Sequence, residues 1–186
     1  MAVASLGLIF AGAILGLAAM DAGLGPGDAL RLAPVLALIM TLGGLAGGAL
    51  FGFAGWLGLR GLIRQGWRWV GWSSLGWGLG LMLPGMGFAF LASTELSSVV
   101  FPLSVALAGA LGGALAGWGQ HRLLADGFPR SVRWIAASAV FTGIGWALTI
   151  QALFLVELLG GLGPVIAALV GGLFVTGIST TALSLL

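Results

Sequence analysis

Long apolar intervals, separated by isolated charged residues, run through the whole chain of 186 residues. Seven Arg and five acidic side chains leave six uncharged intervals: Met1 to Met20, Leu32 to Leu59, Trp69 to Thr94, Leu96 to Gln120, Trp134 to Val156 and Leu158 to Leu186. Each interval reaches the roughly 20 residues that a helix needs to cross about 30 Å of hydrocarbon. The pattern therefore predicts an all-α integral membrane protein with six transmembrane helices in a single domain, residues 1–186.

One part of the chain occurs twice at a constant offset of 65 residues, first from Leu42 to Gly80 and again from Leu107 to Gly145. Each copy consists of an apolar segment rich in Gly and Ala, a short turn with Arg, and a second apolar segment that begins at a Trp. The matched residues include Gly48, Gly52, Arg68, Trp69 and Ser73, which recur as Gly113, Gly117, Arg133, Trp134 and Ser138. The repeat predicts two copies of one helical hairpin.

Weaker similarities extend this repeat toward both termini. Ser5-Leu6-Gly7 resembles Ser74-Leu75-Gly76, and the last apolar interval resembles the start of the second and fourth. We therefore expect three same-direction hairpins, at about 1–64, 65–130 and 131–186. Repeats that all run in one direction argue against the inverted-repeat folds of many transporters.

The Arg residues are distributed unevenly between the two predicted membrane faces. Six follow the second and fourth spans, namely Arg60, Arg64, Arg68, Arg122, Arg130 and Arg133, whereas Arg31 lies on the other side. Short cytoplasmic loops retain positive charge, so we expect this face and both termini to be cytoplasmic.

Small and aromatic residues have a regular spacing in the predicted spans. Gly and Ala at intervals of four let helix backbones approach closely, and this predicts helix-packing positions at Gly44, Gly48, Gly52, Gly109, Gly113 and Gly117. Indoles prefer the boundary between acyl chains and headgroups. We therefore expect Trp56, Trp69, Trp118 and Trp134, near the Arg-rich face, to anchor the protein at that interface.

The prolines predict local features of the spans. Pro34, Pro102 and Pro164 each lie near the outer start of an even-numbered span, where the missing N–H and fixed φ suit a first helical turn. Pro84 instead falls inside the third span. There it removes a backbone hydrogen bond, which predicts a kink. A broken helix around a binding site is the functional alternative.

Few side chains in the sequence can carry chemistry. There is no Cys and a single His, His121, which follows Gln120 at the end of the fourth span. His121 either caps the helix C-terminus or, with Gln120, contributes to a cofactor site as an axial ligand to a pigment magnesium or a haem iron. No cofactor is required, although a chlorophyll-type or carotenoid pigment stays open. The usual catalytic and metal-binding sets are lacking, so we expect no enzyme activity. Seven Arg give no support for nucleic-acid binding.

Two sequence elements occur next to the turns in both copies. The first precedes the turn and is Trp56-Leu57-Gly58-Leu59-Arg60 in one copy and Gln120-His121-Arg122-Leu123-Leu124 in the other. The second follows the turn and is a Trp, Trp69 or Trp134, with a Ser four residues later. They resemble an uncharacterised family of bacterial multi-pass membrane proteins that repeats a Gly-rich helix ending in Gln-Trp-Leu-x-Leu-Arg, a basic loop and a Trp-x-x-x-Ser helix. Photosynthetic lineages are among its hosts, so the resemblance implies a location in a bacterial cytoplasmic (inner) or photosynthetic membrane. The chain departs from this pattern at Gly55, where the family has Gln, and at His121, where it has Trp. The family carries no established activity to transfer.

These observations favour a non-catalytic membrane subunit or scaffold within a larger complex, such as a photosynthetic or respiratory one. Its expected partners are membrane lipids and other integral membrane subunits, with pigments as further candidates. The alternative is a small transporter or channel for a neutral or lipidic substrate, built around the kink at Pro84. A pigment-binding role would require His121 to face a flat cofactor.

Overall fold

Four α-helices make up the part of the chain that the computed structural model describes, namely residues 26–61, 63–91, 97–124, 128 and 130–154. They are α2 (Pro26–Leu59), α3 (Gly66–Leu91), α4 (Ser97–Leu124) and α5 (Arg133–Phe154). No strand occurs in these ranges, so the prediction of an all-α structure is confirmed for them. The predicted first and sixth spans, Pro164 and the outer loops lie outside the described residues.

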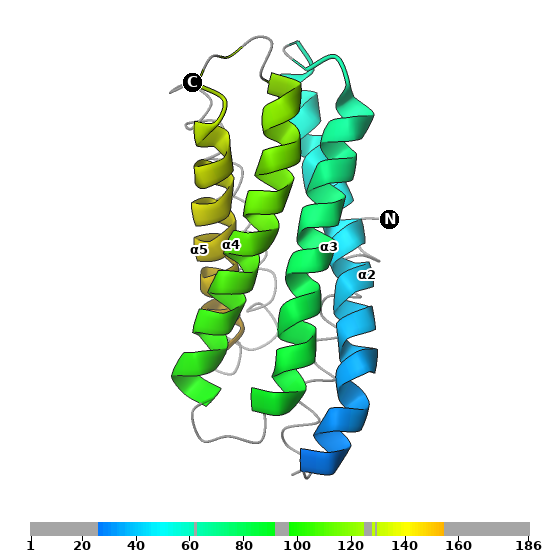
Figure 1. Cartoon of the computed structure of the whole chain (residues 1–186), viewed down its shortest axis with the longest axis vertical. Coiled ribbons are helices and arrows are strands. Elements are labelled where there is room, and N and C mark those ends of the chain that lie inside the picture. Colours follow the sequence, from blue (N-terminus) through cyan, green and yellow to red (C-terminus); the bar gives the residue numbers. More distant parts are fainter. Residues whose placement is uncertain (1–25, 62, 92–96, 125–127, 129, 155–186) are drawn as a thin grey trace.

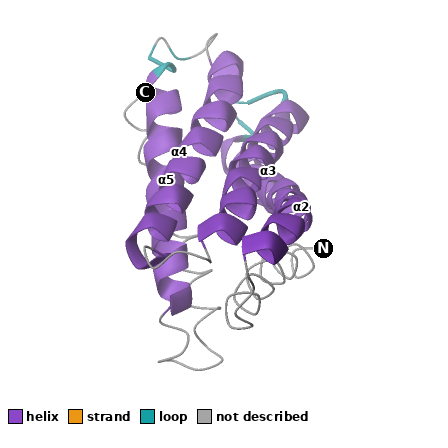
Figure 2. Ribbon diagram, turned by 60° about the horizontal axis from the view of Figure 1, so that its bottom comes forward, coloured by secondary structure: helices purple, strands orange, loops and turns teal. Residues whose placement is uncertain are grey.

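The helices run alternately up and down and pack in chain order, α2 on α3, α3 on α4 and α4 on α5 (Figure 1). Figure 2 shows the same side-by-side arrangement from a second direction. Two helical segments within the described ranges, Arg31–Leu59 and Pro102–Leu124, are long and apolar enough to cross a membrane, judged by length and composition.

The turns from α2 to α3 and from α4 to α5 lie at the same end of the bundle (Figure 1). They also share backbone hydrogen bonds at the offset of 65 residues. In the first pair, Ile63 N–H donates to the Leu59 carbonyl and Phe128 N–H donates to the Leu124 carbonyl, both at 2.9 Å. In the second pair, Arg68 N–H donates to the Gln65 carbonyl at 3.1 Å and Arg133 N–H donates to the Arg130 carbonyl at 2.9 Å. The repeated sequence therefore forms the same turn twice. We call the end of the bundle that carries both turns the Arg end.

Glycines let the two helices of each hairpin approach closely. A Cβ added at Gly48 of α2 would lie only 2.5 Å from the carbonyl oxygen of Ser73 in α3. Gly113 of α4 makes the equivalent approach to the carbonyl oxygen of Ser138 in α5. Real Cβ atoms do not come this close, so both crossings depend on the absence of a side chain. The remaining predicted packing positions make similar approaches: Gly44 to Trp77, Gly52 to Ser73, Gly109 to Thr142 and Gly117 to Ser138.

A second set of small residues joins the two hairpins through α3 and α4. A Cβ at Gly76 would collide with the carbonyl oxygen of Gly112 and with Ala116, and one at Gly80 would lie 3.1 Å from the carbonyl oxygen of Ala108. Small residues on both helices thus bring the backbones together. The four described helices are held by three contacts of one physical kind, close backbone packing that gains van der Waals attraction.

The prolines differ from their predicted positions. Pro34 and Pro102 do not start helices, because α2 begins at Pro26 and α4 at Ser97. Pro26 occupies the first helical position, where its fixed φ is suitable. Both helices therefore begin upstream of the proline that was expected to start them. Pro84 lies within α3, whose helical assignment continues to Leu91, so the helix is not broken there.

An apolar cluster in the bundle takes a buried side chain from every described helix. Met40 of α2, Leu81 of α3, Val105 of α4 and Trp146 of α5 contact one another, and Trp77 packs against them. The rings of Trp77 and Trp146 meet edge to face with centroids 5.7 Å apart. Aromatic pairs of this geometry add about 0.5–1.5 kcal/mol beyond the area that they bury.

The glycine crossings lead to a stability prediction for Gly48→Leu. The new side chain must displace the Ser73 backbone, so we expect the variant to lose roughly 1–3 kcal/mol, as in other overpacked interiors. Gly71→Leu in α3 is the control, because a Cβ there has nothing within 4 Å. Thermal unfolding in detergent, followed by circular dichroism, measures both. Equal stabilities of the two variants would contradict the proposed role of Gly48.

Candidate functional site

A buried chain of hydrogen bonds near the Arg end connects α3, α4 and α5. The side chain of Gln120 in α4 lies at its centre and is 6% exposed. Its Nε2 donates to Ser73 Oγ of α3 at 2.8 Å, and its Oε1 accepts from Trp134 Nε1 of α5 at 2.8 Å. Ser73 Oγ donates in turn to the carbonyl oxygen of Trp69, one turn earlier, at 3.0 Å. One amide therefore links the first hairpin to both helices of the second.

The chemistry of the donors fixes the direction of these bonds. An indole N–H can only donate, so the Gln120 atom that faces Trp134 must be the carbonyl oxygen. The NH₂ group then faces Ser73, whose hydroxyl accepts that bond and gives its own proton to the Trp69 carbonyl. Among the described residues, no buried side-chain nitrogen or oxygen lacks a hydrogen-bond partner. The network is consistent throughout, and this makes a buried polar cluster stabilising rather than costly.

Aromatic and aliphatic side chains surround the network. Trp69 and Trp134, equivalent residues of the two copies, lie with ring centroids 5.7 Å apart, and Ile63 and Leu124 complete the buried cluster. Trp69 is 3% exposed and Trp134 is 4% exposed. Their indoles thus face the interior of the bundle, in contrast to the anchoring role predicted from sequence. The reason is that the described helices pack closely against their neighbours at this end, which leaves both rings between helices.

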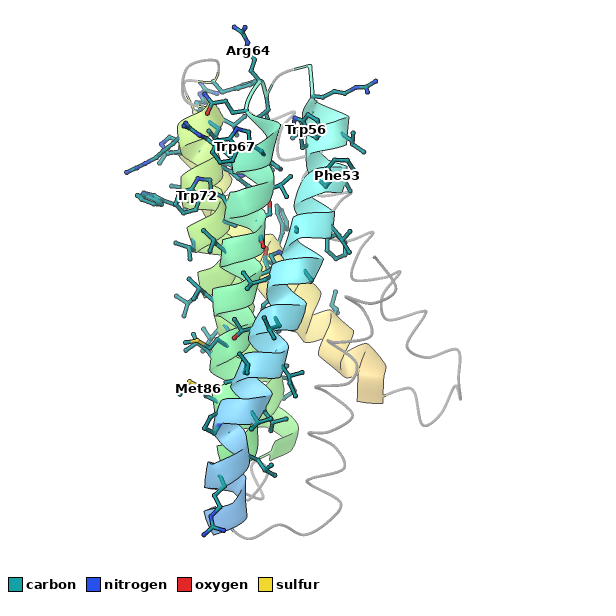
Figure 3. All side chains as sticks on the ribbon, turned by 90° about the vertical axis from the view of Figure 1, so that its right-hand side faces the viewer. Phe53, Trp56, Arg64, Trp67, Trp72 and Met86 are labelled. Atoms are coloured by element: carbon teal, nitrogen blue, oxygen red, sulfur yellow. The ribbon has the colours of Figure 1, made fainter. Side chains whose placement is uncertain are left out.

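The other two predicted anchors lie nearer the surface. Trp118 is 40% exposed, and the guanidinium carbon of Arg122 lies 4.0 Å from its ring centroid. Trp56 is partly buried, and its Nε1 lies 3.3 Å from the Ile63 carbonyl oxygen, to which it donates. Trp56 thereby ties the end of α2 to the following turn. Figure 3 shows Trp56 close to the end of the bundle that carries Arg64.

His121 occupies the position in the second copy that corresponds to Trp56 in the first. Its Nδ1 is 2.8 Å from the hydroxyl of Ser131, which precedes α5. Ser131 corresponds in turn to Gly66, where an added Cβ would overlap the Trp56 ring. Each copy therefore uses one side chain at the end of its first helix to hold the start of its second helix. His121 forms this contact through a hydrogen bond, and Trp56 forms it through packing.

The two copies differ in the central amide. Gly55 stands at the position equivalent to Gln120, and a Cβ placed there would lie 3.6 Å from Trp69 Nε1. Position 55 therefore faces the Trp69 indole as position 120 faces the Trp134 indole. Because the first copy has no side chain here, Gln120 supplies the only amide at these two positions. Its bond to Ser73 makes the connection between hairpins asymmetric.

The arrangement is suited to joining helices. Amide, hydroxyl and indole groups neither hold a charge nor exchange protons readily near neutral pH. No group of three or more His, Asp or Glu that could hold a metal ion occurs in the described part of the chain. The amide oxygen and nitrogen of Gln120 both bond to protein groups, and His121 bonds to Ser131 through Nδ1. A pigment or haem contact at these two residues stays a prediction.

Sequence reasoning did not identify Ser73 and Ser131 as partners of Gln120 and His121. A signal for Ser73 was available, since it follows Trp69 by four residues and a Ser at that spacing can bond the carbonyl one turn back. Ser131 has no comparable signal, because its partner is ten residues away across a turn. The sequence located the polar positions but not their pairing.

The network leads to a prediction for Gln120→Leu. This change keeps the bulk of the side chain but leaves the Trp134 N–H without its acceptor, so we expect a loss of about 1–3 kcal/mol. Gln65→Leu is the matched control, because Gln65 is exposed in a turn and contributes its backbone carbonyl. Thermal unfolding and tryptophan emission of the two variants test this. A Gln120→Leu protein as stable as Gln65→Leu would refute a stabilising network.

Comparison of the chain with models of protein families, with curated proteins and with solved structures found no match. The resemblance drawn from the Trp-Leu-x-Leu-Arg and Trp-x-x-x-Ser elements accordingly stays a prediction. The function has to be inferred from the geometry of the chain itself.

Proposed function

We propose that the chain is a non-catalytic integral membrane protein that acts as a helical scaffold subunit within a larger membrane complex. The observation that carries this proposal is a set of outward-facing apolar side chains that both hairpins share. The equivalent pairs are Leu38 with Leu103, Leu42 with Leu107, Leu75 with Val140, Leu79 with Ile144, and Leu83 with Leu148. Their exposed fractions range from 38% to 64%.

This surface suits a hydrocarbon environment. Soluble monomers rarely expose contiguous apolar patches larger than a few hundred Å². Here Leu75, Leu79 and Leu83 form a line at every fourth position of α3, and equivalent side chains form the same line on α5. The apolar part of α2 from Arg31 to Leu59 spans 29 residues. At 1.5 Å per residue it extends roughly 43 Å, more than the 30 Å or so of a bilayer core.

The charged residues support the same proposal. All seven Arg are exposed, and each lies in a turn or near the end of a helix. Six of them mark the Arg end, whereas Arg31 lies near the start of α2 at the opposite end. A charge at the bilayer centre costs several kcal/mol. The placement of the Arg residues away from the apolar middle of the helices avoids that cost. We infer that the Arg end is cytoplasmic, following the bias of positive charge.

We extend the proposal to six spans, which the sequence divides into three hairpins at about 1–64, 65–130 and 131–186, each closed at the outer face. These hairpins differ from the described pairs α2–α3 and α4–α5, whose turns lie at the Arg end, because α3 and α4 together belong to the second of them. The basis is the repetition, at an offset of 65 residues, of turns, glycine contacts and exposed apolar positions in α2–α3 and α4–α5. The uncharged intervals at residues 1–20 and 158–186 are each long enough for one further span.

A scaffold is favoured over a transporter by the interior of the bundle. Each described helix places a buried apolar side chain in one shared cluster, Met40, Leu81, Val105 and Trp146. Helix α3 continues through Pro84, whereas transporter sites are typically formed by discontinuous helices. Exposed Ala54 and Gly58, four residues apart on α2, offer a close-packing surface to another helix, since a Cβ at Gly58 has nothing within 4 Å.

The topology can be tested with single cysteines, because the natural sequence contains none. In intact cells, we expect Thr94→Cys to react with a membrane-impermeant maleimide and Gln65→Cys to react only after the membrane is opened. Gln65 precedes α3 and Thr94 follows it in the sequence, so the two variants serve as controls for each other. Labelling of both positions from outside would contradict the proposed topology.

The scaffold role can be tested by gentle extraction from the native membrane, with native electrophoresis and mass spectrometry of everything that co-migrates. We expect larger membrane subunits to accompany the wild-type chain and the Gly58→Leu variant to lose part of them, because the added side chain blocks close approach. Gly71→Leu, which fills an open position on α3, is the matched control. Recovery of the wild type as a solitary, colourless monomer would count against a scaffold, whereas visible absorption would direct attention to His121.

A further inference from the structure

An exposed aromatic and cationic patch lies where α3 and α4 meet at the Arg end. Trp72 of α3 packs onto α4 at Gly119, where an added Cβ would overlap its ring. Its ring meets Trp118 of α4 nearly at a right angle, 88°, with centroids 5.6 Å apart. This pair forms a joint indole surface across the two helices. Figure 3 shows Trp67 and Trp72 near the end of the bundle that carries Arg64.

Two Arg residues lie on the Arg-end side of the indole pair. Arg68 precedes Trp72 by four residues and Arg122 follows Trp118 by four, so each lies one helical turn from its Trp on the same helix face. Because α3 starts at the Arg end and α4 finishes there, both turns lead toward that end. The guanidinium of Arg122 lies 4.0 Å from the Trp118 ring centroid, and that of Arg68 lies 5.1 Å from the Trp67 ring centroid.

Apolar side chains continue the patch toward the middle of the bundle. Leu75 follows Trp72 by three residues and is 46% exposed, and Leu111 precedes Trp118 by seven and is 61% exposed. The α3–α4 face thus presents guanidinium groups, then indoles, then aliphatic side chains along the helix axis. A phospholipid has the same sequence of properties from its phosphate through its glycerol esters to its acyl chains.

We infer that this patch is a binding site for one anionic phospholipid, with Arg68 and Arg122 holding the headgroup phosphate. The indoles of Trp72 and Trp118 would cover the glycerol region, where aromatic residues are enriched in membrane proteins. The inference rests on the proposed membrane location. Charge complementarity supports an anionic occupant, since the described residues of the Arg end include six Arg and no Asp or Glu. Asp126 lies outside the described residues.

The first copy of the repeat lacks these features. The positions equivalent to Trp118 and Arg122 are Phe53 and Leu57, which are 49% and 43% exposed. These two positions are equally open but carry neither a guanidinium nor an indole N–H. The repeat alone therefore does not explain the patch, and the site belongs to the contact between α3 and α4.

Native mass spectrometry of the full chain in mild detergent tests the site, with phosphatidylglycerol and phosphatidylcholine added in parallel as probes. We expect one phosphatidylglycerol to be retained in preference to phosphatidylcholine. The double variant Arg68→Gln with Arg122→Gln should weaken that retention roughly thirtyfold, about fivefold for each Arg removed, because each Arg near an anionic lipid surface adds to the attraction. The matched control, Arg64→Gln with Arg130→Gln, removes the same charge from the same end and should keep the preference.

Any one of these results would overturn the site: no preference for phosphatidylglycerol in the wild type, equal weakening in both double variants, or displacement of the lipid by millimolar inorganic phosphate. Equal weakening would indicate a diffuse attraction to the Arg end, and displacement by phosphate would indicate a plain anion site. Retention of another subunit on this face in place of the lipid would also overturn it. The proposed membrane location is tested by a separate experiment, in which the wild-type chain should resist extraction from the membrane by alkaline carbonate. Extraction of the wild-type chain by carbonate would reject the membrane location itself.

Discussion

The described fold depends on close contact between helix backbones at positions that lack a side chain. Gly48 and Gly113 place α2 against α3 and α4 against α5, and Gly76 and Gly112 do the same between α3 and α4. In a bilayer the hydrophobic effect gives helices little reason to associate, so such contacts have to supply much of the attraction. The proposed membrane location thus explains why helices that are apolar on all sides concentrate small residues on the faces that meet.

Close packing of apolar helices supplies attraction but few directional contacts, and the polar residues add direction. Gln120 bonds to Ser73 and Trp134, which belong to different hairpins, so rotation or sliding of α4 would break two buried hydrogen bonds. Each unpaired group would then cost about 1–3 kcal/mol. The bonds therefore specify one register for helices whose apolar surfaces could pack in several. A residue of this kind need not react with anything to be essential to the structure.

The sequence predicted the repeated unit well but not the orientation of its side chains. The offset of 65 residues identified Gly44, Gly48 and Gly52 with their partners in the second copy, and these residues do lie where helices meet. Trp69 and Trp134 were expected at the membrane interface but lie inside, because the position of an indole near a helix end does not reveal which side of the helix faces a neighbour. Pro34 and Pro102 likewise lie inside helices, since residues upstream of each continue the helical conformation. The partners of Gln120 and His121 depend on how three helices meet, which periodicity in one chain segment does not encode.

The two copies match closely along the glycine-rich part of their first helix and differ at the end of that helix. Residues 42–50 and 107–115 each begin with Leu and end with Gly-Gly-Ala-Leu. Both segments lie in the middle of the bundle, where helix backbones meet. The last turns of α2 and α4 differ: Phe53 is aligned with Trp118, Gly55 with Gln120, Trp56 with His121 and Leu57 with Arg122. Backbone packing constrains the first region, because almost any side chain there would separate the helices. The second region lies at the Arg end, and there only the second copy carries an amide, an imidazole and a guanidinium at the aligned positions. Gln120 uses its amide to bind Ser73 of α3, and His121 uses its imidazole to bind Ser131 before α5, so the groups that distinguish the second copy at this end lie where α4 meets its two neighbours.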